Sequence, residues 1–148
     1  MKEKEAFIRH FREVQPKFSR LCLRSLSQTN LTMPQFGLLN TLVSTDALPM
    51  TDVSDKLHIT KPAVTNLVDR LERNKFLKRI PHPEDRRIHL LKIEPKGRKV
   101  VREMQSTILI FLLKALGQFD FSEQKIITEF YARLSKTMDE FLLKSKKR

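Results

Sequence analysis

Side chains that suit contacts with DNA cluster in one short segment of the sequence, residues 60–73. Asn66 can pair bidentately with adenine, and the methyl group of Thr65 can meet a thymine methyl. Arg70 can reach a guanine or a phosphate, and a helix start at residues 60–61 would suit phosphate. The candidate DNA contacts of this segment are Thr60, Lys61, Thr65, Asn66, Arg70 and Arg73.

A helix over this segment would carry the hydrogen-bonding side chains on its outer face. Val64, Leu67, Val68 and Leu71 fall within one stripe at 100° per residue, which predicts a face packed on a core. An ordinary solvated helix shows the same pattern. Contact with DNA is favoured here because a second basic element follows directly in the sequence.

The second element is a basic loop between two β-rich runs, residues 76–80 and 88–93. Pro81 and Pro83 stiffen the loop because each fixes a backbone angle. The sequence therefore predicts a β-hairpin with Arg86 and Arg87 at its tip. Arginines in that position can enter a narrow, electronegative minor groove. The alternative is a pair of solvated surface charges that contribute little.

The net charge of +12 is concentrated where these two elements lie. Residues 60–99 carry 12 basic and 5 acidic side chains, whereas residues 1–59 carry 8 and 6 and residues 100–148 carry 9 and 6. Basic residues that served only to keep the protein soluble would be spread along the whole chain. The distribution favours a polyanionic partner that meets the central forty residues.

Catalytic and metal-binding chemistry finds no support in the residue spacing. No histidine shares a metal-ligand spacing with cysteine or carboxylates, and no glycine-rich phosphate loop or nucleophile elbow occurs. We therefore expect no catalytic residues, no enzyme activity, no cofactor and no metal. Cys22, the single cysteine, lies among packing residues, which favours a buried inert thiol over a redox switch.

Long helices are predicted on both sides of the basic region. Apolar residues recur at heptad-like spacing over residues 5–27 and again from Ser122, where the last helix is expected to start. Residues 108–116 are apolar on nearly every side, which indicates burial on more than one side. Pro95 suits the first position of the helix that contains them.

Capping patterns mark the shorter helices. Thr32 and Gln35 form a capping-box pattern before a helix whose apolar side faces a core. Thr51 and Thr60 are expected to cap two short helices separated by a tight turn, and residues 46–49 are expected to form a loop. The turn contains His58, a residue that tolerates the left-handed conformation better than most.

Three stretches at matching separations resemble the MarR family of bacterial regulators. Residues 83–87, Pro-Glu-Asp-Arg-Arg, followed by a strand and by Glu-Pro-Lys-Gly-Arg at 94–98, are similar to the wing signature of that family. Residues 60–72 resemble its recognition helix, and residues 32–36 resemble the start of its second helix. Lys75 stands where the family commonly has glycine, so Asn74 is expected to supply the cap.

The resemblance implies a mainly α protein with a small β-hairpin wing: a winged helix-turn-helix plus a helical dimerisation domain. An N-terminal dimerisation helix would occupy residues 1–31, the DNA-binding domain residues 32–95, and C-terminal dimerisation helices residues 96–148. Asp85 would hold the wing by pairing with an arginine, and Arg87 would enter the minor groove. A small aromatic or anionic effector would bind between the dimer and DNA-binding parts. Its candidate lining residues, each of which also fits a core position, are Phe11, Phe18, Phe36, Leu39 and Phe111.

We therefore expect a sequence-specific regulator of transcription that binds double-stranded DNA, a ligand-responsive repressor acting as a homodimer on a pseudo-palindromic operator. One alternative is a winged helix that docks a protein partner. Another is a membrane-surface protein that uses the basic tail at residues 144–148, but no helix is both basic on one face and apolar on the other without a partner, so no membrane is expected. The single cysteine and the absence of an apolar leader indicate a cytoplasmic protein.

Overall fold

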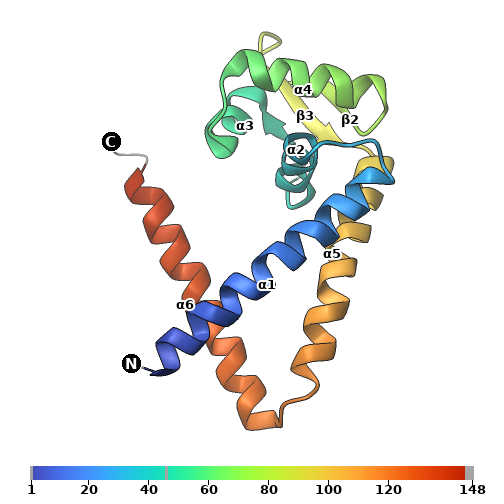
Figure 1. Ribbon diagram of the computed structural model, residues 1–148. Coiled ribbons are helices and arrows are strands. Elements are labelled where there is room, and N and C mark those ends of the chain that lie inside the picture. Colours follow the sequence, from blue (N-terminus) through green and yellow to red (C-terminus); the bar gives the residue numbers. More distant parts are fainter. Residues whose placement is uncertain (1, 46, 146–148) are drawn as a thin grey trace. The chain divides into compact units, whose positions relative to one another are not determined.

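The computed structural model describes residues 2–45 and 47–145, and the side chains as far as residue 142. Helices dominate, and three short strands form one sheet (Figure 1). The mainly α fold with a small β-hairpin is confirmed. In chain order, the elements are α1 (Lys2–Ser27), α2 (Met33–Val43), β1 (Leu48–Pro49), α3 (Met50–Leu57), α4 (Lys61–Arg73), β2 (Leu77–Pro81), β3 (His89–Ile93), α5 (Pro95–Leu116) and α6 (Phe121–Ser145).

Two compact units divide the chain, Met1–Ile108 and Leu109–Arg148. The first holds the sheet, α1 to α4 and the larger part of α5. The second holds the end of α5 and α6. The predicted division into residues 1–31, 32–95 and 96–148 stays a prediction; position 31 lies in the α1–α2 turn and position 95 is the first residue of α5, whereas the two units divide within α5. The last residues of the predicted basic tail, 146–148, lie outside the described part of the chain.

The core of the first unit gathers apolar side chains from five helices and the sheet. The periodic positions of the sequence supply it, because residues three or four apart share one face of a helix. Leu38, Leu42, Val64, Val68 and Leu91 are at most 1% exposed. Val101 of α5 is completely buried as well, so the start of α5 belongs to this core.

The sheet is antiparallel with strand order β1-β3-β2. Leu77 pairs with Ile93 and Pro81 with His89, so β2 and β3 form the predicted hairpin, one residue later in the chain than expected. Strand β1 was wrongly predicted as loop. It has only two residues, and Leu48 pairs with Leu91 on the free edge of β3.

The expected caps are found at α2 and α4 but not at α3. The backbone N–H of Thr32 donates to Gln35 Oε1 at 2.9 Å, and the backbone N–H of Ala63 donates to Thr60 Oγ1 at 3.4 Å. Helix α3 instead begins at Met50, so Thr51 lies inside it. Pro49 is the N-cap residue of α3 and supplies no side-chain cap; at a helix start, the N–H that proline lacks would have no helical partner.

Two non-glycine residues close the turns around α4 with positive φ angles. His58 has φ 52°, as expected, and the hydroxyl of Ser54 donates to the Ile59 carbonyl at 2.8 Å across the same turn. After α4, the prediction for Asn74 was only half right. The Asn74 side chain donates to the Arg70 carbonyl at 2.8 Å, but the left-handed conformation falls on Lys75, with φ 58°.

Gly97 fixes how α5 starts against the hairpin. A Cβ atom at this position would lie 2.2 Å from the backbone carbonyl oxygen of Phe76. No side chain fits in that space, and the backbone N–H of Glu94 also donates to the Phe76 carbonyl at 3.0 Å. The close approach therefore requires glycine and ties the first turn of α5 to the strand that follows α4.

Helix α6 has no buried side chain among its described residues. Asp120 caps it: Asp120 Oδ1 accepts the Glu123 N–H, and Glu123 Oε2 accepts the Asp120 N–H, both at 2.9 Å. The helix starts at Phe121, one residue before the expected Ser122. Among the described residues, no helix is long and apolar enough to cross a membrane.

Candidate nucleic-acid interface

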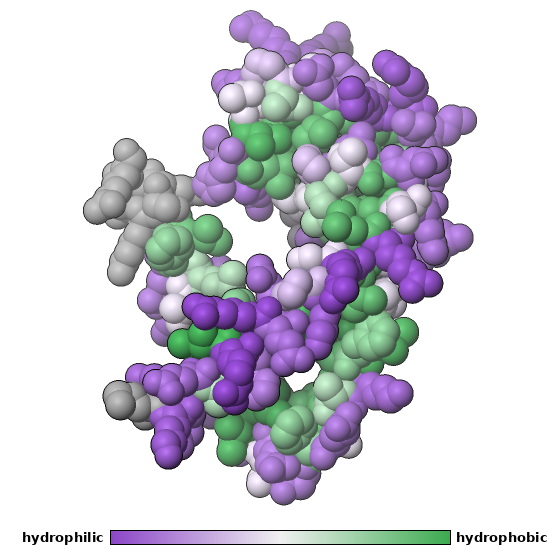
Figure 2. All heavy atoms as spheres, viewed as in Figure 1, coloured by the Kyte–Doolittle hydropathy of each residue, from purple (hydrophilic) through white to green (hydrophobic). Residues whose placement is uncertain are grey.

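The outer face of α4 presents polar side chains to solvent. Because Val64, Val68 and Leu71 are buried, the helical rotation of 100° per residue places Asn66 and Arg73 on the opposite side. All six residues predicted to contact DNA in this segment are exposed. The surface over α4 and the wing is hydrophilic in the space-filling view (Figure 2). The local fold therefore leaves these side chains available to a groove of DNA.

The N-terminus of α4 offers fewer free backbone donors than expected. Pro62 has no N–H, and the N–H of Ala63 is occupied by the side chain of Thr60. A phosphate at this end would depend on Lys61, through its ammonium and its own N–H. The hydroxyl of Thr65 donates to the Lys61 carbonyl at 3.1 Å, which leaves the Thr65 methyl group for base contact.

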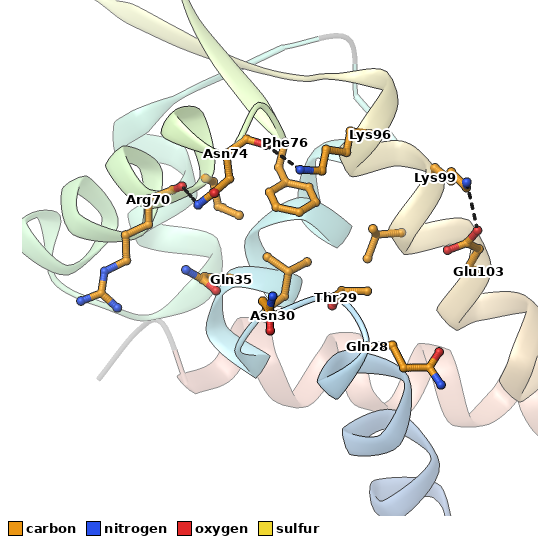
Figure 3. Close-up of a pocket in the computed structure, with 13 residues that line it drawn as sticks. Gln28, Thr29, Asn30, Gln35, Arg70, Asn74, Phe76, Lys96, Lys99 and Glu103 are labelled. Carbon is orange, nitrogen blue, oxygen red and sulfur yellow. Dashed lines mark hydrogen bonds and ion pairs between the residues drawn. The ribbon is translucent and has the colours of Figure 1, made fainter.

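Arg70 lies on a flank of α4 rather than on its outermost line. It lines a cavity of about 380 Å³ together with Gln35 of α2 and Lys96 of α5 (Figure 3). The figure shows its guanidinium at one edge of that cavity. Arg70 is thus placed to reach a phosphate beside the groove more readily than a base edge within it.

An arginine that sequence reasoning missed joins the recognition helix to the wing. Arg79 of β2 forms ion pairs with Asp69 at 2.5 Å and with Glu72, and its backbone N–H donates to Glu72 Oε1 at 2.9 Å. Partial burial by itself would lower the pKa of Arg79. The hydrogen bonds with Asp69 and Glu72 outweigh that effect and raise the pKa.

This network fixes the angle between α4 and the hairpin. Asp69 and Glu72 are three residues apart, so they share the flank of α4 that faces β2. The spacing of these two carboxylates could have predicted a basic partner on the neighbouring strand. The sequence alone, however, does not show which of its many basic residues is that partner. Arg79 also neutralises the acidic side chains that lie beside the candidate DNA-reading face.

The tip of the wing is ordered by its own backbone. The N–H of His82 donates to the Ile88 carbonyl at 2.9 Å, and the N–H of Ile88 donates to the Asp85 carbonyl at 3.0 Å. Asp85 Oδ1 accepts the backbone N–H of Arg87 at 2.9 Å. The expected pairing of Asp85 with an arginine side chain is therefore replaced by a contact with backbone, which holds the loop directly.

Arg86 and Arg87 stand free at this tip. Both are exposed, and neither forms an ion pair within the described part of the chain. His82 is half-buried, and its Nδ1 accepts the backbone N–H of Glu84 at 3.2 Å. Two unpaired arginines on a hydrogen-bonded loop form a rigid basic projection beside α4.

The predicted effector residues differ in burial. Leu39 is completely buried in the core, Phe36 and Phe18 are half-buried, and Phe11 is 59% exposed. Phe111 is 51% exposed and belongs to the second unit. Neither described cavity is lined by any of the five. Leu39 packs in the core, and the role of the other four residues stays a prediction, because apolar positions on a helix look alike whether they face a core or a ligand.

Metal-ligating side chains do not cluster in the described residues. No group of three or more histidine, cysteine, aspartate or glutamate side chains there could hold a metal ion. Cys22 is half-buried and packs against the core of the first unit.

Comparison with known proteins agrees with the geometry. Residues 31–89, which include α2 to the start of β3, match the MarR family. The HTH-type transcriptional regulator YsmB of Bacillus subtilis is 26% identical over 113 residues, covering 76% of this chain and 77% of YsmB. Transcriptional regulator Tm0710 of Thermotoga maritima is 26% identical with a TM-score of 0.70, covering 92% of this chain and 96% of that one.

Solved structures of MepR from S. aureus share the fold. A MepR mutant bound to an oligodeoxyribonucleotide is 24% identical, with a TM-score of 0.68 and coverage of 91% of this chain and 97% of that one. MepR bound to ethidium bromide is 24% identical, with a TM-score of 0.69 and coverage of 91% and 96%. MarR-family proteins are regulators of transcription and not enzymes. With its winged helix and its basic, exposed outer face on α4, the chain is similar to the MarR family of DNA-binding transcriptional regulators, whose family model its residues 31–89 match.

Proposed function

We propose that the protein reads a specific DNA sequence by placing α4 in the major groove and the wing tip in the adjacent minor groove. The observation that carries this proposal is the joint presentation of Asn66 on α4 and Arg87 on a wing locked to α4 by Arg79. The amide of Asn66 has no partner within the described residues, so both its donor and its acceptor are available to adenine. The two arginines of the tip add charge that a narrow minor groove attracts.

The proposed active form is a homodimer, in which the winged helix-turn-helix of each subunit binds one half of a pseudo-palindromic operator. Large apolar side chains are exposed on the second half of α5, including Ile110 at 63% and Leu113 at 54%, and Figure 2 shows hydrophobic residues gathered along that helix. On α6, Ile126, Met138 and Phe141 are 57–73% exposed. So many contiguous apolar side chains on long helices are typical of an association surface. A second copy is the partner proposed because operators bound by such heads are themselves two-fold symmetric.

Regulation by a small effector is part of the proposal, with repression as the expected effect on transcription. One relative of the same fold, MepR, has been solved both with an oligodeoxyribonucleotide and with ethidium bromide. The two structures support the idea that this fold can couple DNA and small-molecule binding.

Selection from genomic fragments with purified full-length protein tests the proposal. We expect enrichment of a two-fold symmetric site whose half-sites lie about one helical turn apart. Binding to this site should weaken steeply with salt, because phosphate contacts release counterions. No enrichment, together with capture of a protein that contacts α4, would instead favour a winged helix that docks a protein partner.

A further inference from the structure

The first turn of α5 carries two basic side chains that bind the carboxyl ends of two other helices. Arg98 Nη1 donates to the backbone carbonyl of Val43, the last residue of α2, at 3.1 Å. The Lys96 ammonium donates to the carbonyl of Asn74, the C-cap residue of α4, at 3.0 Å (Figure 3). The last carbonyls of a helix have no partner within the helix and form the negative end of its dipole. One turn of α5 therefore supplies cationic donors to the ends of both α2 and α4.

These two cations are held in place by their surroundings. Arg98 is half-buried, and the Lys96 ammonium lies 4.3 Å from the centroid of the Phe76 ring. Neither side chain forms an ion pair with a carboxylate in the described part of the chain. Their contacts with backbone carbonyls are charge-assisted hydrogen bonds, which are shorter and stronger than those between neutral groups.

A third polar contact lies further along the same pair of helices. Gln105 Nε2 donates to Asn40 Oδ1 at 3.0 Å. Gln105 follows Arg98 by seven residues, or two helical turns, and Asn40 precedes Val43 by three, so the two contacts share one flank of each helix. Two contacts about 10 Å apart along α5 set the direction of α2 as well as its position.

Apolar packing alone would not set this direction so sharply. Val101 and Met104 of α5 are 0% and 3% exposed in the core of the first unit. Apolar contacts have no preferred direction, whereas a hydrogen bond weakens steeply when its angle departs from the straight arrangement. The polar contacts therefore select one angle among similar packings of α5 on α2 and α4.

We propose that Lys96 and Arg98 are positioning residues that set the separation of the two half-sites that the protein accepts. Helix α4 reads DNA in the proposed function, and α5 continues into the exposed Ile110 and Leu113 of the proposed dimer interface. A fixed angle of α4 and α2 on α5 determines where each subunit places its α4 along the operator. A loose angle would allow several separations. The effect on DNA rests on the proposed function, whereas the angle between the helices does not.

A series of operators with altered spacing tests the effect on DNA. Starting from the operator obtained by genomic selection, the two half-sites are moved apart by one, two or three base pairs. Two added base pairs shift one half-site by about 7 Å and turn it by about 70°. The native protein should then lose about a hundredfold in affinity, because only one subunit can bind its half-site.

Arg98→Met and Lys96→Met should flatten this dependence on spacing. Each keeps an unbranched stem but removes the donor to the helix end. We expect weaker binding at the original spacing and a further loss of less than about tenfold when two base pairs are added. A variant that merely folded less well would lose affinity by the same factor at every spacing.

Arg102→Met is the matched control on the same helix. Arg102 is exposed and forms no hydrogen bond or ion pair within the described residues. Its replacement removes the same charge from the same helix, so it accounts for a general loss of attraction to DNA. The control should keep the native dependence on spacing.

Residual dipolar couplings of backbone N–H groups measure the helix angles without DNA. In the native full chain and in Arg102→Met, couplings from α2, α4 and residues 95–108 should fit one common alignment. In Arg98→Met, α2 and α5 should require different alignments, while the dispersed signals of the core residues show that the protein is folded.

Three results would overturn the proposal. The first is a native dependence on spacing in both Arg98→Met and Lys96→Met. The second is an equal loss at every spacing, because the two side chains would then only stabilise the fold. The third is one common alignment in Arg98→Met. If the native protein itself bound all spacings equally, the proposed reading of two half-sites would fail, and the couplings alone would decide whether these residues fix the helix angles.

Discussion

Replacing Arg79 with methionine should show how much DNA binding depends on the orientation of the wing and how much depends on its positive charge. The substitution keeps an unbranched apolar stem but removes the guanidinium that pairs with Asp69 and Glu72. Arg79 is 24% exposed, whereas its two partners are 46% and 35% exposed, so solvent screens part of each interaction. Hydrogen bonds between charged groups contribute about 1.5–3 kcal/mol when well shielded. After that discount we expect unfolding free energy to fall by about 1–2 kcal/mol in total.

The Arg79→Met substitution should also lower the affinity for the operator. Without Arg79 the hairpin loses its fixed angle to α4, and two carboxylates lie uncovered beside the phosphates. We expect operator affinity to fall by about ten- to a hundredfold, which corresponds to about 1.4–2.7 kcal/mol. Fluorescence anisotropy with a labelled operator measures the affinity, and urea unfolding at a fixed protein concentration measures the stability.

Lys92→Met supplies the matched control, because it removes one positive charge from the other strand of the hairpin without touching α4. Both variants should change the slope of log affinity against log salt to a similar small extent. The additional loss in Arg79→Met should persist at high salt, because a misplaced wing is not corrected by screening. If Arg79→Met bound the operator as well as Lys92→Met does, the proposed positioning role of Arg79 would be refuted.

Three further predictions concern the turn, the wing and assembly. Lys75→Gly should raise unfolding free energy by about 0.5–1 kcal/mol in urea titration, because glycine adopts the positive φ without strain; a loss would show that the Lys75 side chain contributes more than the strain costs. Arg87→Ala should lower the salt slope by about 0.9 for each phosphate charge no longer neutralised; an unchanged slope would place Arg87 away from the DNA backbone. Ile110 is 63% exposed within one chain, so Ile110→Asp should leave a monomer folded but dissociate a dimer in analytical ultracentrifugation; an unchanged sedimentation coefficient would exclude this face from the interface.

Much of the fold could be predicted because it depends on local pattern. The spacing of Val64, Val68 and Leu71 predicted both the helix and its buried face. Thr32 and Thr60 marked helix starts because capping is an interaction between residues three apart. Strand β1 and the start of α3 escaped prediction, since two residues carry no periodicity and Pro49 begins the helix without a side-chain cap.

The rest of the site depends on contacts between distant residues. Arg79 and Asp69 are ten residues apart, and only the packing of the hairpin on α4 brings them together. The cavity combines Gln35 with Lys96, which are brought together by the close approach of Gly97 to Phe76. The complete burial of Leu39, which was predicted as a candidate effector contact, could not be predicted for the same reason. Apolar periodicity identifies a buried face but does not show what covers it.

The most direct test of sequence reading by α4 compares Asn66→Ala with the native protein on two DNA duplexes. One duplex is the operator from genomic selection and the other is a scrambled sequence of the same length and base composition, both measured at one salt concentration. The exposed amide of Asn66 should contribute roughly 1–3 kcal/mol to operator binding and nothing to random DNA, so the ratio of the two affinities should fall about five- to a hundredfold. Equal losses on both duplexes, or no loss on either, would contradict base recognition by Asn66 and the proposed docking of α4 in the major groove.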